Sequence, residues 1–424
     1  MAATLQTPAF RSPMVERGGI SRIAPLPMNQ ARFGRHHLVP RSLSLLSQQS
    51  LHVIRLARAS SGSDQAYGNN QFNSNGSWGL FLWTKQVLNF ARSNFVPIAL
   101  VVGIFLGFTN PIFGQLAVKY PLSKFSTAGI FFISGLTLRS KEISAAVEAW
   151  PAGILGLTSI LLVTPFFAWV ILQVNLSPRE FVTGLAIFCC MPTTLSSGVA
   201  LTQLVGGNSA LALAMTVVSN LLGIMIVPFS LTNFVGGEAR VSLPTMQLFK
   251  SLVMTLLVPL AMGKVLRHCL KSVAAFVDQN RQYVAMISAT LLSIVPGTQV
   301  SRSKPQLLRV RPENLVAAVI MGLVVHLIFL ALNAIIVGAF SFFCGGQESI
   351  LAKRENARAV IIVASQKTLP VMVAVVEQLR GAFGEPGLLV LPCVAAHINQ
   401  IIIDSFLVNW WIKKNQMAHF TKQV

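Results

Sequence analysis

Ten apolar stretches, joined by short polar connections, run along the chain from about residue 95 to residue 412. Several reach the length of about 18–25 residues that a helix needs to cross the hydrocarbon core of a membrane. The stretches cover residues 95–113, 124–138, 150–174, 180–205, 209–232, 246–266, 281–295, 313–343, 357–376 and 387–412. The pattern predicts an all-α polytopic membrane protein with ten transmembrane helices. Residues 124–138 and 281–295 are short for a span, so we expect these helices to be tilted, bent or held among other helices.

The fourth apolar stretch carries a polar interruption near its middle. Pro192 is followed by Thr193, Thr194, Ser196, Ser197 and then a glycine. Proline removes a backbone donor and clashes with the preceding turn, so we expect the helix to break at Pro192. A broken backbone at membrane depth survives only where protein buries it or where it lines a wet cavity. The alternative is a kinked packing helix whose hydroxyls bond back to their own carbonyls.

The ninth stretch repeats this interruption. Gln366, Lys367 and Thr368 lie inside an apolar run and are followed by Pro370, the second predicted helix break. Two five-helix halves, each interrupted in its fourth helix, are typical of an inverted-repeat secondary transporter. An odd number of spans in each half turns the second half upside down, so we expect the two breaks to meet near the middle of the membrane.

Composition supports a membrane protein. The chain has 424 residues, of which 53% are hydrophobic and 11% charged, whereas a soluble domain has about 25% charged residues. The net charge of +20 is spread over the N-terminal segment and short loops, as expected for topology signals and lipid-headgroup contacts rather than for nucleic-acid binding. Cys189, Cys190, Cys344 and Cys393 lie in or beside apolar runs, where we expect small hydrophobic residues and not a metal site.

The first 60 residues have the composition of an organellar transit peptide. They contain eight arginines, no lysine and a single acid, Glu16. Early prolines oppose one continuous amphipathic helix and favour a chloroplast over a mitochondrial address. We therefore predict a transit peptide over residues 1–60, a disordered linker over 61–90, the transporter domain over 91–413 and a short tail over 414–424. The predicted location is the chloroplast envelope, and a helical bundle favours its inner membrane.

Several motifs resemble one family of transporters. They are Thr127–Ile130, Ser134–Leu138, Cys189–Pro192 and Thr216–Asn220, together with Gly207-Asn208. Over about residues 90–413 the chain is similar to the bile-acid:sodium symporter family, in the SBF-like branch that includes plastid sodium/metabolite cotransporters. This resemblance implies a panel domain, made of the first, second, sixth and seventh segments, beside a core domain in which the two broken helices cross.

The resemblance also implies which residues hold sodium. The matching positions are Ser197, Thr216 and Gln366. Three positions depart from the family pattern: Gly198 replaces an asparagine, Ala212 a hydroxyl residue and Ile362 the carboxylate. The implied site therefore keeps neutral oxygen ligands and loses its anionic ligand.

Lys367 places an ammonium group beside the second break. At low effective dielectric this charge repels sodium by several kcal/mol. It can replace the ion electrostatically, bind an anionic substrate, or serve only as a snorkelling lysine at a loop end.

Other polar residues lie in the eighth and tenth stretches. They are His326, His397, Asn399, Gln400 and Asp404. His397 and Asp404 are two turns apart on one helix face, and we consider a proton path that joins them to Lys367. Hydrogen bonding between helices is the alternative for each of these residues.

The sequence therefore predicts a secondary transporter that couples sodium to the movement of a small organic anion by alternating access. The candidate cavity residues are Thr193, Thr194, Ser196, Lys367, Thr368, His397 and Asp404. The alternatives are a sodium-independent, proton-coupled carrier and a regulatory membrane protein that affects calcium homeostasis. No nucleophile elbow or zincin motif occurs, so we do not expect an enzyme. We expect no cofactor apart from the coupling ion, and the oligomeric state is left open.

Overall fold

The computed structural model describes residues 95–110, 114, 119–120, 122–139, 149–237, 245–343, 350, 353–379 and 381–421, with no side chains for 418–421. Helices and their connections make up this part of the chain, and no strand occurs within it. The whole of the predicted transit peptide and of the predicted linker lies outside the described residues, as does Cys344.

Each of the ten predicted segments coincides with helix. The first five give α3 (Phe95–Thr109), α5 (Leu122–Thr137), the α7–η2–α8 rod (Trp150–Thr158, Ser159–Val163, Thr164–Leu172), α9 (Arg179–Cys189) with α10 (Ser197–Leu204), and α11–η3 (Ser209–Ser230, Leu231–Gly236). The second five give α13–η4–α14 (Thr245–Leu252, Val253–Leu257, Val258–Cys269), α16 (Arg281–Arg302), α18 (Pro312–Phe343), α19 (Arg354–Ser365) with α20 (Leu369–Gln378), and α21 (Pro386–Thr421). Two short helices, α15 (Lys271–Gln279) and α17 (Lys304–Leu307), were not predicted.

Seven helical rods in the described residues are long and apolar enough to cross a membrane. The structure corrects the prediction that 281–295 is a short span, because α16 has 22 residues and ends at Arg302. Burial of Pro296, Gly297 and Thr298 against other helices stabilises this extension where local propensity does not. α21 likewise continues beyond residue 413 to Thr421, and the predicted domain bounds stay predictions. Ten spans remain a prediction.

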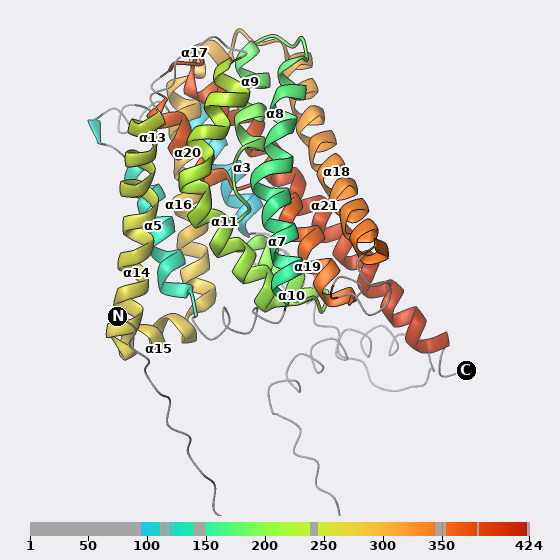
Figure 1. The fold of residues 1–424 in the computed structure, drawn as a ribbon. Coiled ribbons are helices and arrows are strands. Elements are labelled where there is room, and N and C mark those ends of the chain that lie inside the picture. The colour runs from blue at the N-terminus through green and yellow to red at the C-terminus, as the bar shows by residue number, and fades with distance from the viewer. Residues whose placement is uncertain are drawn as a thin grey trace, which may run out of the picture. The chain divides into compact units, whose positions relative to one another are not determined.

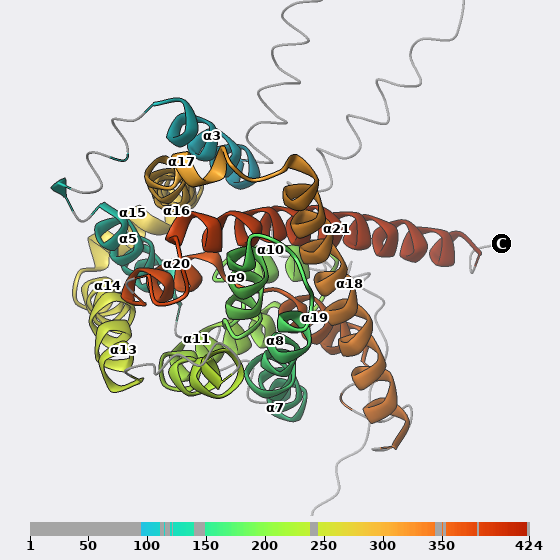
Figure 2. The same cartoon turned by 90° about the horizontal axis from the view of Figure 1, so that it is seen from above.

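The helices of the predicted panel pack against one another. α3 lies along α16, and α5 lies along both α14 and α16 (Figure 2). Glycines allow the α5–α14 contact: a Cβ on Gly135 would meet the Leu260 carbonyl oxygen, and one on Gly263 would meet the Phe132 carbonyl oxygen. Small residues let backbones approach in this way where lipid gives no hydrophobic drive for association.

Each broken helix has its two halves at opposite ends of the bundle. α9 and α20 lie toward one end and α10 and α19 toward the other (Figure 1). α10 packs on α19, and α9 also contacts α20. The two interruptions therefore lie between the paired halves, deep in the bundle.

An exposed ion-pair cluster fixes the end of the α5–α14 pair. Asp278 of α15 accepts hydrogen bonds from Arg267 (2.8 Å) and Arg139 (3.2 Å). The hydrogen bond from Arg267, reinforced by Arg139, lowers the pKa of the Asp278 carboxyl below its usual value.

Candidate ion and substrate site at the crossing

The two interruptions are in direct backbone contact. α9 ends at Cys189 and α10 starts at Ser197, while Gln366–Thr368 is extended between α19 and α20. The Thr368 amide donates to the Pro192 carbonyl oxygen at 2.9 Å. Pro192 lies inside its break, as predicted. Pro370 instead lies in the first turn of α20, where its missing N–H removes no helical bond.

The Lys367 side chain is buried at the crossing, with 1% of its surface exposed. Its Nζ donates to the Thr164 hydroxyl at 2.6 Å, to the Met191 carbonyl at 2.8 Å and to the Ile160 carbonyl at 3.0 Å. The Phe329 ring centroid lies 5.8 Å from Nζ. A lysine ammonium has three donors, so all of them are satisfied here. Lys367 is therefore not a snorkelling lysine, and in this conformation it has no donor left for an anionic substrate.

The local sequence explains why the Ile160 carbonyl is free to bind Lys367. Ser159–Val163 forms a π-helical turn, in which the Thr164 amide donates to the Ser159 carbonyl five residues back. The next donor in this register would be the amide of residue 165, but that residue is a proline and has no N–H. The Ile160 oxygen consequently accepts only from side chains, namely Lys367 and the Thr164 hydroxyl at 2.9 Å.

The backbone of Lys367 is held from the side of α21. The Lys367 amide donates to Gln400 Oε1 at 3.0 Å, and Gln400 Nε2 donates to the Lys367 carbonyl at 2.8 Å. His397 Nδ1 lies 3.3 Å from the same carbonyl and 2.7 Å from Gln400 Nε2. The Gln400 amide side chain thus binds both backbone polar groups of Lys367 in the extended segment, and Gln400 and His397 position the lysine.

Gln366 connects the two breaks to a buried carboxylate. Its Nε2 donates to Asp404 Oδ2 at 2.6 Å, while its Oε1 accepts from Ser197 at 2.9 Å and from Thr194. Asp404 is fully buried. Ile362, the position that the resemblance assigns to the carboxylate, packs instead in an apolar cluster with Val408. A carboxyl group is therefore present at the crossing, but α21 supplies it.

Asp404 and His397 have different hydrogen-bond partners, and the proton path that joins them to Lys367 stays a prediction. Asp404 Oδ1 pairs with His326 Nε2 of α18 at 2.8 Å, whereas His397 points to the Lys367 backbone. The two-turn spacing on α21 places both residues near the crossing, but a residue of a different helix takes the second oxygen. His326 Nδ1 also lies 3.3 Å from the Ser365 carbonyl.

The remaining predicted residues divide between the crossing and its surroundings. Thr193 donates to the Val363 carbonyl, and Asn220 Nδ2 donates to the Thr193 carbonyl at 3.0 Å. Thr216 is buried but donates to the Ala212 carbonyl of its own helix, and the described residues show no hydrogen bond from it to Ser197 or Gln366. Asn220 Oδ1 is buried without a hydrogen-bond partner in the described part of the chain.

Ser196 and Thr368 differ in their position. Ser196 is exposed and precedes α10 without capping it by its side chain, so it lies outside the buried crossing in this conformation, and its place in a substrate cavity stays a prediction. A break within a helix turns successive side chains in different directions, which the hydroxyl-rich composition does not reveal. Thr368 is buried, and its backbone joins the two breaks.

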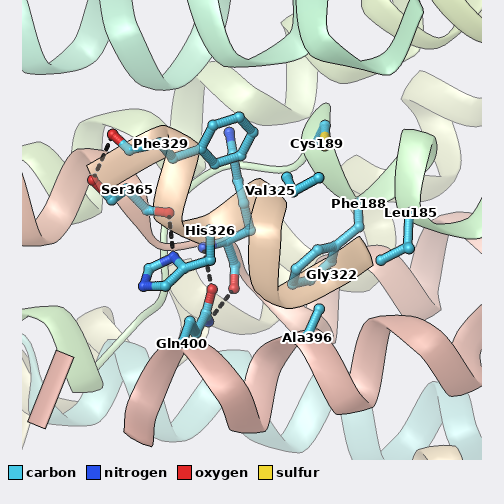
Figure 3. A pocket seen from close by; sticks show the side chains of 11 residues that line it. Leu185, Phe188, Cys189, Gly322, Val325, His326, Phe329, Ser365, Ala396 and Gln400 are labelled. Carbon is cyan, nitrogen blue, oxygen red and sulfur yellow. Dashed lines mark hydrogen bonds between the residues drawn. The ribbon is translucent and has the colours of Figure 1, made fainter. Parts of the chain in front are cut away.

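A small pocket lies beside Lys367, between α9, α18 and α21. Leu185, Phe188, Gly322, Val325 and Ala396 form its apolar side, and His326, Ser365 and Gln400 its polar side (Figure 3). Its free volume of about 10 Å³ is near the lower limit for one water molecule. The crossing is therefore closed to an organic solute in this conformation, and its polar groups bind one another.

Comparisons with known proteins agree with this architecture. Residues 94–413 match the SBF-like CPA transporter family. The chain belongs to this family. It is 62% identical over 330 residues to a protein of Oryza sativa subsp. indica named probable sodium/metabolite cotransporter BASS4, chloroplastic, covering 78% of each chain. The Arabidopsis thaliana protein of the same name is 59% identical over 332 residues, which is 78% of this chain and 76% of the relative.

A more distant relative carries a different name. Sodium/bile acid cotransporter 7-B of Xenopus laevis is 26% identical over 318 residues, which cover 73% of this chain and 89% of the relative. The family resemblance expected from the motifs is thus confirmed, and the chain is a member of a transporter family and not an enzyme.

Proposed function

We propose that this SBF-like family member is a secondary transporter that moves a small organic anion across the inner chloroplast envelope membrane by alternating access, with sodium as the coupling ion. The observation that carries the proposal is the contact between two broken helices, deep in the bundle, at a cluster of oxygen atoms. The names of the rice and Arabidopsis relatives support the location and the ion.

Oxygen donors suited to a hard cation gather on one side of the crossing. Thr194, Ser197 and Gln366 contribute neutral oxygens, and the Gln366 amide contacts the Asp404 carboxylate. Asn220 Oδ1, buried beside the first break, has no hydrogen-bond partner in the described residues, and a cation would satisfy it. This donor set fits sodium, and Asp404 supplies the carboxyl group that position 362 lacks.

An anionic substrate is favoured by the two helices that start at the crossing. α10 begins at Ser197 and α20 at Leu369, so both positive helix ends point toward the interruption. Lys367 does not carry this proposal, since oxygens of the protein satisfy all of its donors. A substrate site requires a second conformation, in which the core helices move relative to α3, α5, α14 and α16.

Uptake by proteoliposomes tests the function. Purified protein is reconstituted, and uptake of labelled mono-, di- and tricarboxylates is measured under an inward sodium gradient and under an equal choline gradient. We expect sodium to accelerate uptake of at least one anion class and Gln366→Leu to abolish the acceleration. Cys269→Ser, which changes an exposed thiol, is the matched control. Uptake of every anion at the rate of empty liposomes contradicts transport.

Proton coupling is a second candidate, and the buried His326–Asp404 pair favours it. The same liposomes distinguish the two ions when a pH gradient replaces the sodium gradient. Uptake that follows the pH gradient and ignores sodium supports a proton-coupled carrier.

A further inference from the structure

The oxygens around the Lys367 ammonium group have the composition of a cation site. Two are backbone carbonyls, of Ile160 and Met191, and the third is the Thr164 hydroxyl, at 2.6–3.0 Å from Nζ. The Ile160 carbonyl and the Thr164 hydroxyl come from the α7–η2–α8 rod, at and directly after its π turn. The Met191 carbonyl comes from the break after α9. We propose that the Lys367 ammonium occupies a cation position of the crossing, and that this position binds a free alkali cation when the side chain is shortened.

The two carbonyl oxygens need a hydrogen-bond donor or a cation as partner for reasons of local backbone structure. The Ile160 carbonyl lacks a backbone donor because Pro165 has no N–H, and the Met191 carbonyl follows the end of α9. Buried carbonyls without partners are strongly disfavoured. A lysine ammonium satisfies them as three hydrogen-bond acceptors, and an alkali cation satisfies the same oxygens as ligands.

Because the Lys367 ammonium is covalently attached to the protein, it changes the number of ions that each transport cycle moves. A free ion binds and dissociates in each transport cycle, whereas the Lys367 charge stays with the protein. This consequence rests on the proposed sodium coupling: the wild-type protein uses one coupling ion fewer than a variant in which the position takes a free ion. The three oxygens around Lys367 Nζ are distinct from the Thr194–Ser197–Gln366 cluster, since the two groups share no side chain.

Two variants separate the loss of charge from the opening of space. Lys367→Ala removes the ammonium and leaves room for an ion, while Lys367→Met removes the charge and refills most of the volume. The melting temperature of each purified protein is followed in sodium chloride and in choline chloride at equal ionic strength. A cation that binds only the folded state raises the melting temperature as its concentration grows. We expect sodium to raise the melting temperature of Lys367→Ala more than the melting temperature of wild type. For Lys367→Met, we expect the rise in melting temperature to be no larger than for wild type.

The ligands are tested by a second substitution. Thr164→Val in the Lys367→Ala background removes one oxygen, and we expect at least a tenfold higher half-saturating sodium concentration. A sodium response of Lys367→Ala that equals that of Lys367→Met, or that Thr164→Val leaves unchanged, overturns the proposal. Ammonium chloride should also stabilise Lys367→Ala, because the ion returns the missing donors.

If Lys367→Ala folds poorly, a second short variant takes its place. Lys367→Asn is then used, since its amide can donate to one of the freed oxygens. If both short variants fold in sodium but not in choline, the proposal holds; if neither folds in either salt, sodium does not replace the ammonium and the proposal fails. The sodium response of wild type tests the proposed function separately, and its absence leaves the difference between Lys367→Ala and wild type unaffected.

Discussion

Replacement of Asp404 is the perturbation whose size can be worked out most directly from the structure. Its carboxyl group is fully buried and contacts two nitrogen atoms, Gln366 Nε2 at 2.6 Å and His326 Nε2 at 2.8 Å. In Asp404→Ala both contacts are lost. A buried donor left without a partner costs about 1–3 kcal/mol, so the loss of stability is about 2–6 kcal/mol.

Asp404→Asn tests the same reasoning with the shape preserved. An asparagine carbonyl can accept from one of the two donors, but its amide then faces the other. We expect roughly half of the alanine effect, or about 1–3 kcal/mol. The double variant Asp404→Ala/His326→Leu should lose less stability than the sum of its single changes, because the two residues share one contact.

Thermal unfolding in detergent measures these effects. We expect the melting temperature to fall in the order wild type, Asp404→Asn, Asp404→Ala. Glu313→Ala, at an exposed position of α18, is the control, since surface changes usually stay within about 0.5 kcal/mol. Melting of Asp404→Ala at the temperature of the control would refute the interpretation of Asp404 as a buried, paired carboxylate.

Three further predictions test other parts of the account. Gly263→Val places a Cβ in steric overlap with the Phe132 carbonyl oxygen and should destabilise the α5–α14 contact by about 1–3 kcal/mol in thermal unfolding; an unchanged melting temperature contradicts this packing. Gly198→Ala brings a Cβ to 3.1 Å from Gln366 Oε1 and should weaken sodium stabilisation, whereas an unaltered sodium titration argues against Gln366 as a ligand. Folding lowers the pKa of Asp278. Its contribution to folding stability is therefore present above the unfolded pKa of about 3.9 and is lost as the pH falls through the lower folded pKa. The melting temperatures of wild type and Asp278→Asn should consequently differ at pH 7 and converge in acid.

Much of the fold could be predicted because hydrophobic length and proline position report directly on helices in a membrane. The ten apolar stretches and both interruptions follow from such local features. The end of α16 could not, since Pro296 and Gly297 are poor local helix residues and only burial among other helices keeps them helical.

The site was predicted less completely, because its contacts join residues far apart in the chain. Gln366, Lys367 and Asp404 stand out as polar residues in apolar runs, but no spacing shows that His326 and not His397 pairs with Asp404. The acceptors of Lys367 were missed. Thr164 directly before a proline in an apolar run was the available signal, whereas the π turn that frees the Ile160 carbonyl leaves no mark in the sequence.

Equilibrium binding of radioactive sodium to purified protein tests the central claim most directly. We expect saturable sodium binding to wild type, loss of that binding in Gln366→Leu, and an additional equivalent of bound sodium in Lys367→Ala. This result would place the coupling ion at the crossing of the broken helices and the Lys367 ammonium in a neighbouring cation position. Absence of saturable sodium binding in both wild type and Lys367→Ala would contradict the account.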